Sequence, residues 1–346
     1  MSKTNGAACP RVDIGGQAVM EGVMMKGPEA IAIAVRRPDK SIVVKRNEYT
    51  PLSKKHKWMG WPLVRGVVNF CYMLVSGMQT LEESTKMLGV MDEEPTKFEL
   101  WLSKKLGKGI DKIVMAVALV LAVLLSVGLF FLIPSIFAQW LNNTGMGKVG
   151  VNLLSGLLRI LILVGYMIFC ACVPDVRRTF QYHGAEHKTV YCHEHDLPLT
   201  PANAQQFSTL HPRCGTAFLL IVFIISMLLY TVIGYNGDVF IWRFLSHLAL
   251  LPVVAGVSYE VLKGLAHSET KLAKALRWPG LQMQRLTTRQ PDEGMLECAI
   301  VAMNVALTGL PKNAPTTEEG YTVLKDYTQS EAGYEFPAEA EDEAKA

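Results

Sequence analysis

Two histidines and a glutamate, spaced as His183-x-x-Glu186-His187, are the residues of this chain best suited to metal chemistry. On a helix, residues i and i+4 lie one turn apart on one face, so His183 and His187 can bind the same ion, most often zinc. Glu186 lies beside them, and a carboxylate there can take a proton from water and return it to a leaving group. This inverted zinc-protease spacing predicts a divalent metal, zinc above others, with Glu186 as the catalytic base.

A second group, HPRC at residues 211–214, offers a third ligand for that metal. Either Cys214 or His211 can fill the role, because both residue types bind zinc. Glu260 closes a later apolar segment, where an ionisable residue is a candidate for function; an ion pair with Lys263 is the alternative. Residues 193–196, His-Glu-His-Asp, form a poorer metal site because sequence neighbours do not share a helix face, and only Glu194 is kept from them as a candidate.

The composition indicates a membrane protein, so the candidate metal-binding residues must lie within or beside its membrane helices. Half of the 346 residues are apolar and only 19% are charged, with a mean hydropathy of +0.23. A soluble domain usually carries about a quarter charged residues. About 20 apolar residues cross the hydrocarbon layer, and four segments are long enough: 113–140, 151–173, 214–235 and 244–262. The net charge of +3 is too small to indicate a nucleic-acid partner.

The basic residues predict the orientation, because lysine and arginine are retained on the cytoplasmic side. Residues 1–112 carry 18 of the 34 basic residues, whereas the two outer connections carry only Lys148 and Arg243. We therefore expect a multi-pass protein of the cell (inner) membrane with both termini and the histidine-rich loop 174–213 in the cytoplasm. Arg159, in the outer half of the second span, is expected to reach outward to the surface.

Residues 61–83 form a fifth apolar stretch, which is predicted to lie in the membrane interface rather than to cross. Its polar residues recur on one helical stripe opposite an apolar face, as in an interfacial amphipathic helix. The stripe comprises Arg65, Asn69, Tyr72, Ser76, Gln79 and Glu83.

The remaining segments predict a cytoplasmic α+β portion attached to an α-helical integral membrane protein. Within 1–60, the β-rich runs 30–36 and 41–47 flank a turn and predict a hairpin, with 15–28 as a single strand packing under it. An interfacial helix and linker (61–111) and a four-span domain (112–262) follow. Segment 263–310 is predicted to be helical, with Asp292 as a helix cap, and 311–346 to be an acidic disordered tail.

Five segments resemble, in order, the YqhQ-like family of bacterial membrane proteins: DIGGQAVMEGVMMKGP, YHGAEHKTVYCHE, HPRCGT, PVVAGVSYE and PGLQMQRLTTRQPD. The resemblance covers roughly residues 12–308 and leaves the tail outside. It implies a predicted metal-dependent enzyme. The positions that carry the family pattern are Gly15, Gly16, Gln17, Glu21, Gly22, His183, Glu186, His187, Cys192, Glu194, His211, Arg213, Cys214, Glu260, Gln284, Arg285, Thr288 and Arg289.

The function expected from these observations is a zinc hydrolase at the cytoplasmic membrane face. Its substrate would be a membrane-embedded peptide or a lipid-linked ester, with Arg213, Arg285 and Arg289 available for an anionic headgroup. The alternative is a non-enzymatic scaffold or adaptor whose metal is closed by four protein ligands: His183, His187, His211 and Cys214. A transporter ranks third, because the spans hold no chain of ionisable residues beyond Arg159 and His247. A metal position left open to water indicates the hydrolase, whereas four protein ligands indicate the scaffold.

Overall fold

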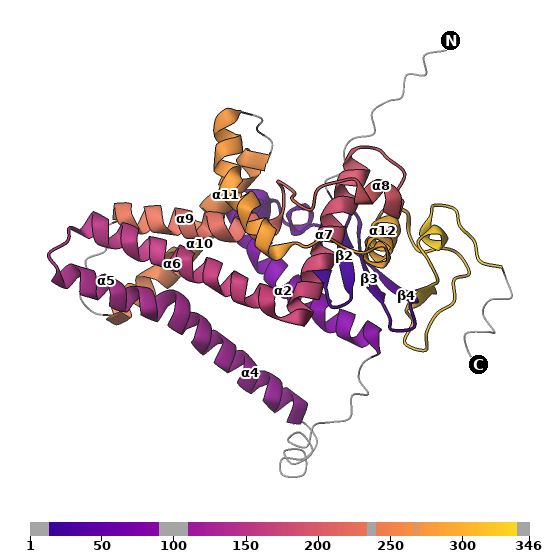
Figure 1. Ribbon diagram of the computed structural model, residues 1–346, viewed down its shortest axis with the longest axis horizontal. Coiled ribbons are helices and arrows are strands. Elements are labelled where there is room, and N and C mark those ends of the chain that lie inside the picture. The colour runs from indigo at the N-terminus through magenta and orange to yellow at the C-terminus, as the bar shows by residue number, and fades with distance from the viewer. Residues whose placement is uncertain (1–13, 90–109, 234–239, 267, 269, 338–346) are drawn as a thin grey trace.

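A computed structural model describes residues 14–89, 110–233, 240–266, 268 and 270–337. Long helices extend to one side of a layer built from a β-sheet and shorter helices (Figure 1). The protein is mostly helical, and its sheet is antiparallel with the strand order β1-β2-β3-β4-β5. The strands are β1 (Gly15–Val19), β2 (Gly22–Lys26), β3 (Ala30–Arg36), β4 (Ile42–Glu48) and β5 (Thr322–Leu324).

The N-terminal strands agree with the predicted hairpin and extend it. Residues 30–36 and 41–47 pair as β3 and β4, which confirms that prediction. Residues 15–28 differ from the single strand expected, because Met20 and Glu21 form a tight turn and the segment folds back as β1 and β2. Glu21 accepts a positive φ of 50° at this turn.

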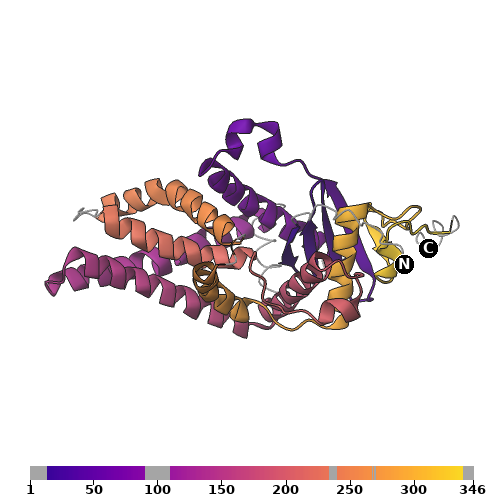
Figure 2. The same cartoon turned by 90° about the horizontal axis from the view of Figure 1, so that it is seen from above.

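Alternating side chains of the sheet enter two different apolar cores. Val23, Met25 and Ala34 pack with α7 (Pro174–Glu194) and α12 (Glu293–Thr308). Ile33 and Val35 pack on the other face with the end of α2 (Val64–Leu88). The sheet is therefore a middle layer between α2 and the α7–α12 pair (Figure 2). As the sequence predicts, the Asp292 side chain caps α12, accepting a hydrogen bond from Met295 N at 2.8 Å.

The C-terminal segment differs from the predicted disordered tail over residues 311–337. Strand β5 pairs with β4, and Leu324 and Phe336 are buried in the α12 core. The few apolar side chains of this polar segment are thus enough to hold it on the sheet. Residues 338–346 lie outside the described residues.

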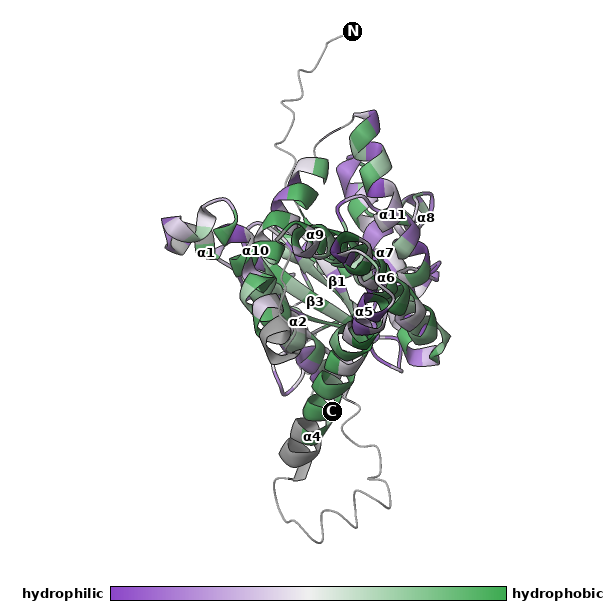
Figure 3. Cartoon of the chain, turned by 90° about the vertical axis from the view of Figure 1, so that its left-hand side faces the viewer, coloured by the Kyte–Doolittle hydropathy of each residue, from purple (hydrophilic) through white to green (hydrophobic). Residues whose placement is uncertain are grey.

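The long helices are apolar on the outside, as expected in contact with lipid. Three are long and apolar enough to cross a membrane: Val117–Asn143, Lys148–Cys172 and Leu248–Leu265. The first comprises most of α4 (Ile110–Val127), a π-helical turn η3 (Gly128–Leu132) and α5 (Ile133–Asn143); the others form α6 (Lys148–Cys172) and the end of α10 (Phe240–Ala266). Helix α9 (Gly215–Ile233) contains a shorter apolar stretch, Phe218–Val232. Apolar residues dominate these helices in Figure 3.

Helix α2 confirms the helical periodicity of residues 61–83 but turns most of its polar stripe inward, with Gln79 left exposed. Asn69, Tyr72 and Ser76 line a cavity inside the protein, and Glu83 pairs with Lys45 of β4. The apolar face opposite is open, with Leu74, Val75 and Met78 among its most exposed side chains. The remaining helices are α1 (Leu52–Lys55), η1 (Lys57–Gly60), α8 (Pro201–Gln205), α11 (Lys271–Thr287) and η4 (Thr328–Ser330).

Candidate metal centre

Helix α7 places His183 and His187 one turn apart, as the spacing predicts. Their ring centroids are 4.4 Å apart. Gly184, which lowers the intrinsic helix propensity, is explained by packing. A methyl group at this position would overlap the carbonyl oxygen of Arg289, because the chain after α11 runs directly across the helix. The glycine therefore allows the close approach that brings α11 to the two histidines.

Cys214, just before α9, completes a cluster of three possible ligands with His183 and His187. The ligand atoms of the three residues all lie within 4.8 Å of one another, and His183 Nε2 is 3.3 Å from Cys214 Sγ. Donors around a tetrahedral zinc, with bonds of 2.0–2.3 Å, lie roughly 3.3–3.8 Å apart. His187 and Cys214 are buried and His183 is half-buried. The residues present therefore fit a small divalent ion after only a slight contraction.

Backbone carbonyls orient both histidines toward this cluster. His183 Nδ1 lies 2.8 Å from Thr287 O, at the end of α11, and His187 Nδ1 lies 2.5 Å from Thr209 O. The last carbonyls of a helix have no partner within the helix, so Thr287 is free to accept this bond. When each Nδ1–H donates to a carbonyl, the lone pair is left on Nε2. Metal-binding histidines are usually held in this way.

The Nε2 atom of His187 is a buried lone-pair donor that is available to bind a metal ion. It is buried and has no hydrogen-bond partner among the described residues. Burial lowers the pKa of His187, which keeps the ring neutral and its lone pair available near pH 7. An unpaired nitrogen in a buried position is costly, and an ion shared with His183 and Cys214 would remove that cost.

Glu186 is the buried acid beside the cluster. Its side chain packs on Gly16 of β1, where a Cβ atom would lie 2.8 Å from Glu186 Cγ. Burial raises the pKa of Glu186 to about 7, while His183 and the backbone N–H of Gly16 act in the opposite direction. Its Oε2 atom is buried without a partner among the described residues. A carboxyl group that titrates near neutral pH is suited to proton transfer.

His211, the other candidate for third ligand, is engaged elsewhere. Its Nε2 lies 3.2 Å from Glu194 Oε1, and its Nδ1 accepts a hydrogen bond from Arg213 N at 3.3 Å. Gln284, fully buried, holds the backbone of His211 through two bonds, of 2.8 Å and 2.7 Å. Glu194 also pairs with Arg213. His211 and Glu194 thus support the loop that carries Cys214, and their side chains lie outside the three-ligand cluster.

The remaining candidates lie outside the cluster, and two of them, Gln17 and Arg213, line the cavity beside it. Glu260 binds Arg65 of α2 at 2.5 Å, so it joins α10 to α2 and is not one of the three side chains of the cluster. Glu21 pairs with Arg178 and thereby fixes α7 to the β1–β2 turn. Arg285 and Arg289 are exposed and do not line the cavity described next, unlike Arg213 and Gln17. Cys192 is buried in the α12 core.

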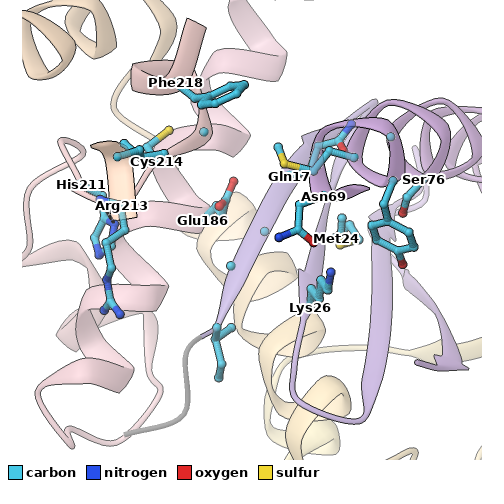
Figure 4. Close-up of a pocket in the computed structure, with 18 of the residues that line it drawn as sticks. Gln17, Met24, Lys26, Asn69, Ser76, Glu186, His211, Arg213, Cys214 and Phe218 are labelled. Carbon is cyan, nitrogen blue, oxygen red and sulfur yellow. Dashed lines mark hydrogen bonds between the residues drawn. The ribbon is translucent and has the colours of Figure 1, made fainter. Parts of the chain in front are cut away.

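A cavity of about 300 Å³ reaches the cluster. Glu186 and Cys214 lie on one side of it, while the sheet and α2 contribute Gln17, Lys26, Asn69 and Ser76 on the other (Figure 4). His187 also lines this cavity. Lys26 and Asn69 were not expected from the sequence, because a lysine in a strand and an asparagine in an apolar helix carry no motif. Thr209 and Thr287 were missed for a different reason: they act through their carbonyl groups, which every residue has.

Three helices long and apolar enough to cross a membrane, a sheet-and-helix layer and a His-His-Cys cluster beside a cavity together suggest a membrane protein with a candidate metal centre. The chain belongs to the DUF1385 family of proteins of unknown function, which matches residues 61–309. It is 34% identical over 301 residues to "Uncharacterized protein YqhQ" of Bacillus subtilis (strain 168), an alignment that covers 85% of this chain and 92% of that protein. The resemblance noted in the sequence is thereby confirmed. No solved structure matches the chain.

Proposed function

We propose that this protein is a membrane-bound metal-dependent hydrolase, with zinc as the preferred ion, held by His183, His187 and Cys214. The observation that carries the proposal is the shared geometry of the two histidines. Each has its Nδ1 on a backbone carbonyl, which leaves both Nε2 lone pairs for the space beside Cys214. Glu186 reaches the same cavity and is the proposed general base.

The chemistry would be the addition of water to a carbonyl carbon. A divalent ion at this site supplies positive charge that acidifies water and polarises the carbonyl group. Glu186 accepts the proton of the attacking water and then delivers it to the leaving oxygen or nitrogen. Its pKa of about 7 allows both steps near neutral pH. The buried position of Glu186 keeps bulk water from competing for that proton.

The alternative function, a scaffold with a structural metal, requires four protein ligands. His211 was the expected fourth ligand, but its Nε2 is directed to Glu194. Among the described residues, only three histidine, cysteine or acidic side chains converge on this point, and the cavity borders it. This arrangement favours a position open to substrate over a closed site.

We further propose that four helices cross the cell (inner) membrane, with α9 as the fourth span, and that both termini are cytoplasmic. The basic residues support this orientation, and the sheet layer, the cluster and loop 174–213 then lie together at the cytoplasmic face. The exposed apolar residues of α2 would contact the same lipid surface.

Metal analysis of the full-length protein, purified in detergent, tests the proposed ligands. We expect His187→Ala and Cys214→Ser each to lower bound zinc by at least about tenfold, since each loses one of three bonds. His193→Ala is the matched control on the same helix and should bind as wild type. Glu186→Gln should keep its zinc but fail to replace the wild-type gene in a deletion strain, because the amide cannot accept a proton.

Two results would overturn the proposal. If Glu186→Gln loses zinc as completely as His187→Ala, the glutamate is a ligand and not the base. If Glu186→Gln is active and stable while His211→Ala releases the metal, the site is a four-ligand staple and the scaffold function replaces the hydrolase.

A further inference from the structure

Lys26, at the end of β2, faces the cavity in an unusual environment for a lysine. Its Nζ atom lies 4.0 Å from the ring centroid of Tyr49 and 4.5 Å from that of Tyr72. The two rings are themselves 5.5 Å apart and hold the ammonium group between them. No carboxylate pairs with Lys26 in the part of the chain that the structure describes. Burial lowers the pKa of Lys26, which is the expected effect when no anion compensates for lost water.

Lys45, on β4, is a lysine of the same sheet whose charge is paired within the protein, and it serves as a comparison for Lys26. It also lies over a tyrosine ring, with its Nζ atom 5.5 Å from the Tyr321 centroid, but it pairs with Glu83 at 2.6 Å. Two lysines of one sheet thus have aromatic contacts, and one of them has an anionic partner. The cation of Lys26 is directed instead into the cavity, beside the Asn69 amide (Figure 4).

The rest of the cavity changes character between the sheet and the membrane helices. Near α9 and α10 its wall is apolar, with Phe70, Phe218 and Leu262. Met73 of α2 both lines the cavity and is 55% exposed, so the cavity reaches the outer apolar face of α2. The methyl group of Met73 approaches Gly215, next to Cys214, and a Cβ atom there would lie 3.5 Å from it. Met73 therefore covers the gap between α2 and the start of α9.

From this arrangement we infer that the cavity binds an anionic phospholipid or phospholipid-like ester, with the phosphate on Lys26 and the acyl chain leaving between α2 and α9 past Met73. A phosphate with a lysine forms a charge-assisted hydrogen bond, and the two tyrosines hold that lysine in place for it. The apolar wall accepts the first part of the chain, and the membrane accepts the remainder. This inference rests on the proposed function only in treating the lipid as the substrate.

Native mass spectrometry of the full-length protein in detergent, after removal of metal by a chelator, measures lipid binding directly. The probes are dioleoyl phosphatidic acid, dioleoyl phosphatidylcholine and glycerol 3-phosphate. We expect Lys26→Met to weaken phosphatidic acid binding about tenfold and phosphatidylcholine binding less, because the choline group already compensates the charge of that phosphate. Lys26→Arg should retain most of the affinity. Lys45→Met is the matched control and should bind phosphatidic acid as wild type.

Met73→Trp tests the acyl-chain path with a variant that leaves Lys26 in place. The larger ring should close the gap beside Gly215 and weaken both lipids, without affecting the binding of glycerol 3-phosphate. Met78→Trp, on the exposed face of the same helix but away from the cavity, should change neither. Thermal stability is measured for each variant, and only variants that melt within a few degrees of wild type are compared.

Three outcomes would overturn the inference. Equal losses for Lys26→Met and Lys45→Met would show general attraction of anions to a basic surface. If glycerol 3-phosphate binds as tightly as phosphatidic acid, the cavity is a site for soluble phosphates. If an apolar peptide displaces the lipid equally well from wild type and from Lys26→Met, the substrate is a peptide. Bound zinc, measured on samples that were not chelated, separates the two proposals: zinc without lipid preference refutes only the lipid, and lipid preference without zinc refutes only the hydrolase.

Discussion

A single buried acid, Glu186, links the chemistry of this protein to its stability. Glu186 is 6% exposed, and its side chain lies against the glycine backbone of β1, where ionisation costs more than it does in water. The proton on Glu186 is therefore held more tightly in the folded chain than in the unfolded one. The same property that suits the residue to proton transfer makes the folded state sensitive to pH.

The pKa of Glu186 predicts the direction of that sensitivity in metal-free protein. The pKa is about 7 in the folded state, against the ordinary value of 4.5 for a glutamate in the unfolded chain. Below pH 4.5 both states hold the proton. As the pH rises from 4.5 to 7, the unfolded chain releases it first, so the folded state loses up to about 3 kcal/mol. Glu186→Gln has no such loss. Its melting temperature relative to wild type should therefore increase between pH 5 and pH 8, and a constant difference would contradict the raised pKa.

Gly184 gives a second prediction for a single residue. Gly184→Ala would place a methyl group against the carbonyl oxygen of Arg289 and separate α7 from the end of α11. We expect a loss of about 1–3 kcal/mol of stability and a lower zinc content, because Thr287 would no longer reach His183. Gly165→Ala in α6 is the control, since its Cβ atom would meet nothing within 4 Å. If both variants melt as wild type does, the close approach is not required.

The sequence predicts part of this site, and the limit has a physical cause. His183, Glu186 and His187 belong to one helix, so the 3.6-residue period places them without knowledge of the rest. The choice between Cys214 and His211 depends on Gln284, which holds the His211 backbone from 73 residues away. A contact of this kind has no local periodicity, and the sequence alone leaves both residues open.

At the scale of elements, α2 shows why an amphipathic pattern predicts a helix but not which face is buried. Its polar stripe marks one face of the helix in the sequence, and in the structure residues of that face, such as Glu83 and Asn69, meet the sheet and the cavity. An apolar face that remains exposed beside apolar spanning helices is the face expected to contact lipid. The amphipathic pattern is the same whether the polar face or the apolar face of α2 packs on the protein.

The position of α2 can be measured with cysteine variants in liposomes, after Cys71 is replaced by serine. A fluorophore on Leu74→Cys or Met78→Cys should be quenched by lipids brominated high on the acyl chain, because an interfacial helix penetrates only about 5–10 Å. A fluorophore on Glu318→Cys, an exposed position outside α2 in the segment before β5, serves as the aqueous control. Strongest quenching by bromines at the bilayer centre would mean that α2 crosses the membrane.

At the scale of the molecule, the long apolar helices and the sheet differ in how far the sequence predicts them. The candidate spans follow from composition and length, which are local. The pairing of β4 with β5 joins residue 44 to residue 322. Likewise, the apolar face of α12 is buried by residues of β2 and β3, which lie far from it in the sequence. Such contacts explain why residues 311–337 looked disordered while they complete the sheet.

The orientation of the whole molecule is tested with reporter fusions. Because basic residues are retained in the cytoplasm, a reporter at Lys148 should be exposed outside, and reporters at His195 and Lys312 should stay inside. Reporters are alkaline phosphatase, active outside, and green fluorescent protein, fluorescent inside, at each position. An outside signal at His195 would place the candidate metal centre on the wrong face for a cytoplasmic hydrolase.

The separation along the chain between the sheet and α12 also determines how long after the sheet α12 is synthesised. About 260 residues separate the end of β4 from the end of α12. At about 5–20 residues per second, the ribosome needs on the order of 10 to 50 s to make them. During that interval the first four strands have been synthesised, but the helix that covers Val23, Met25 and Ala34 has not. In the proposed topology, the nascent chain therefore inserts its apolar helices into the bilayer before α12 is available to cover that face of the sheet.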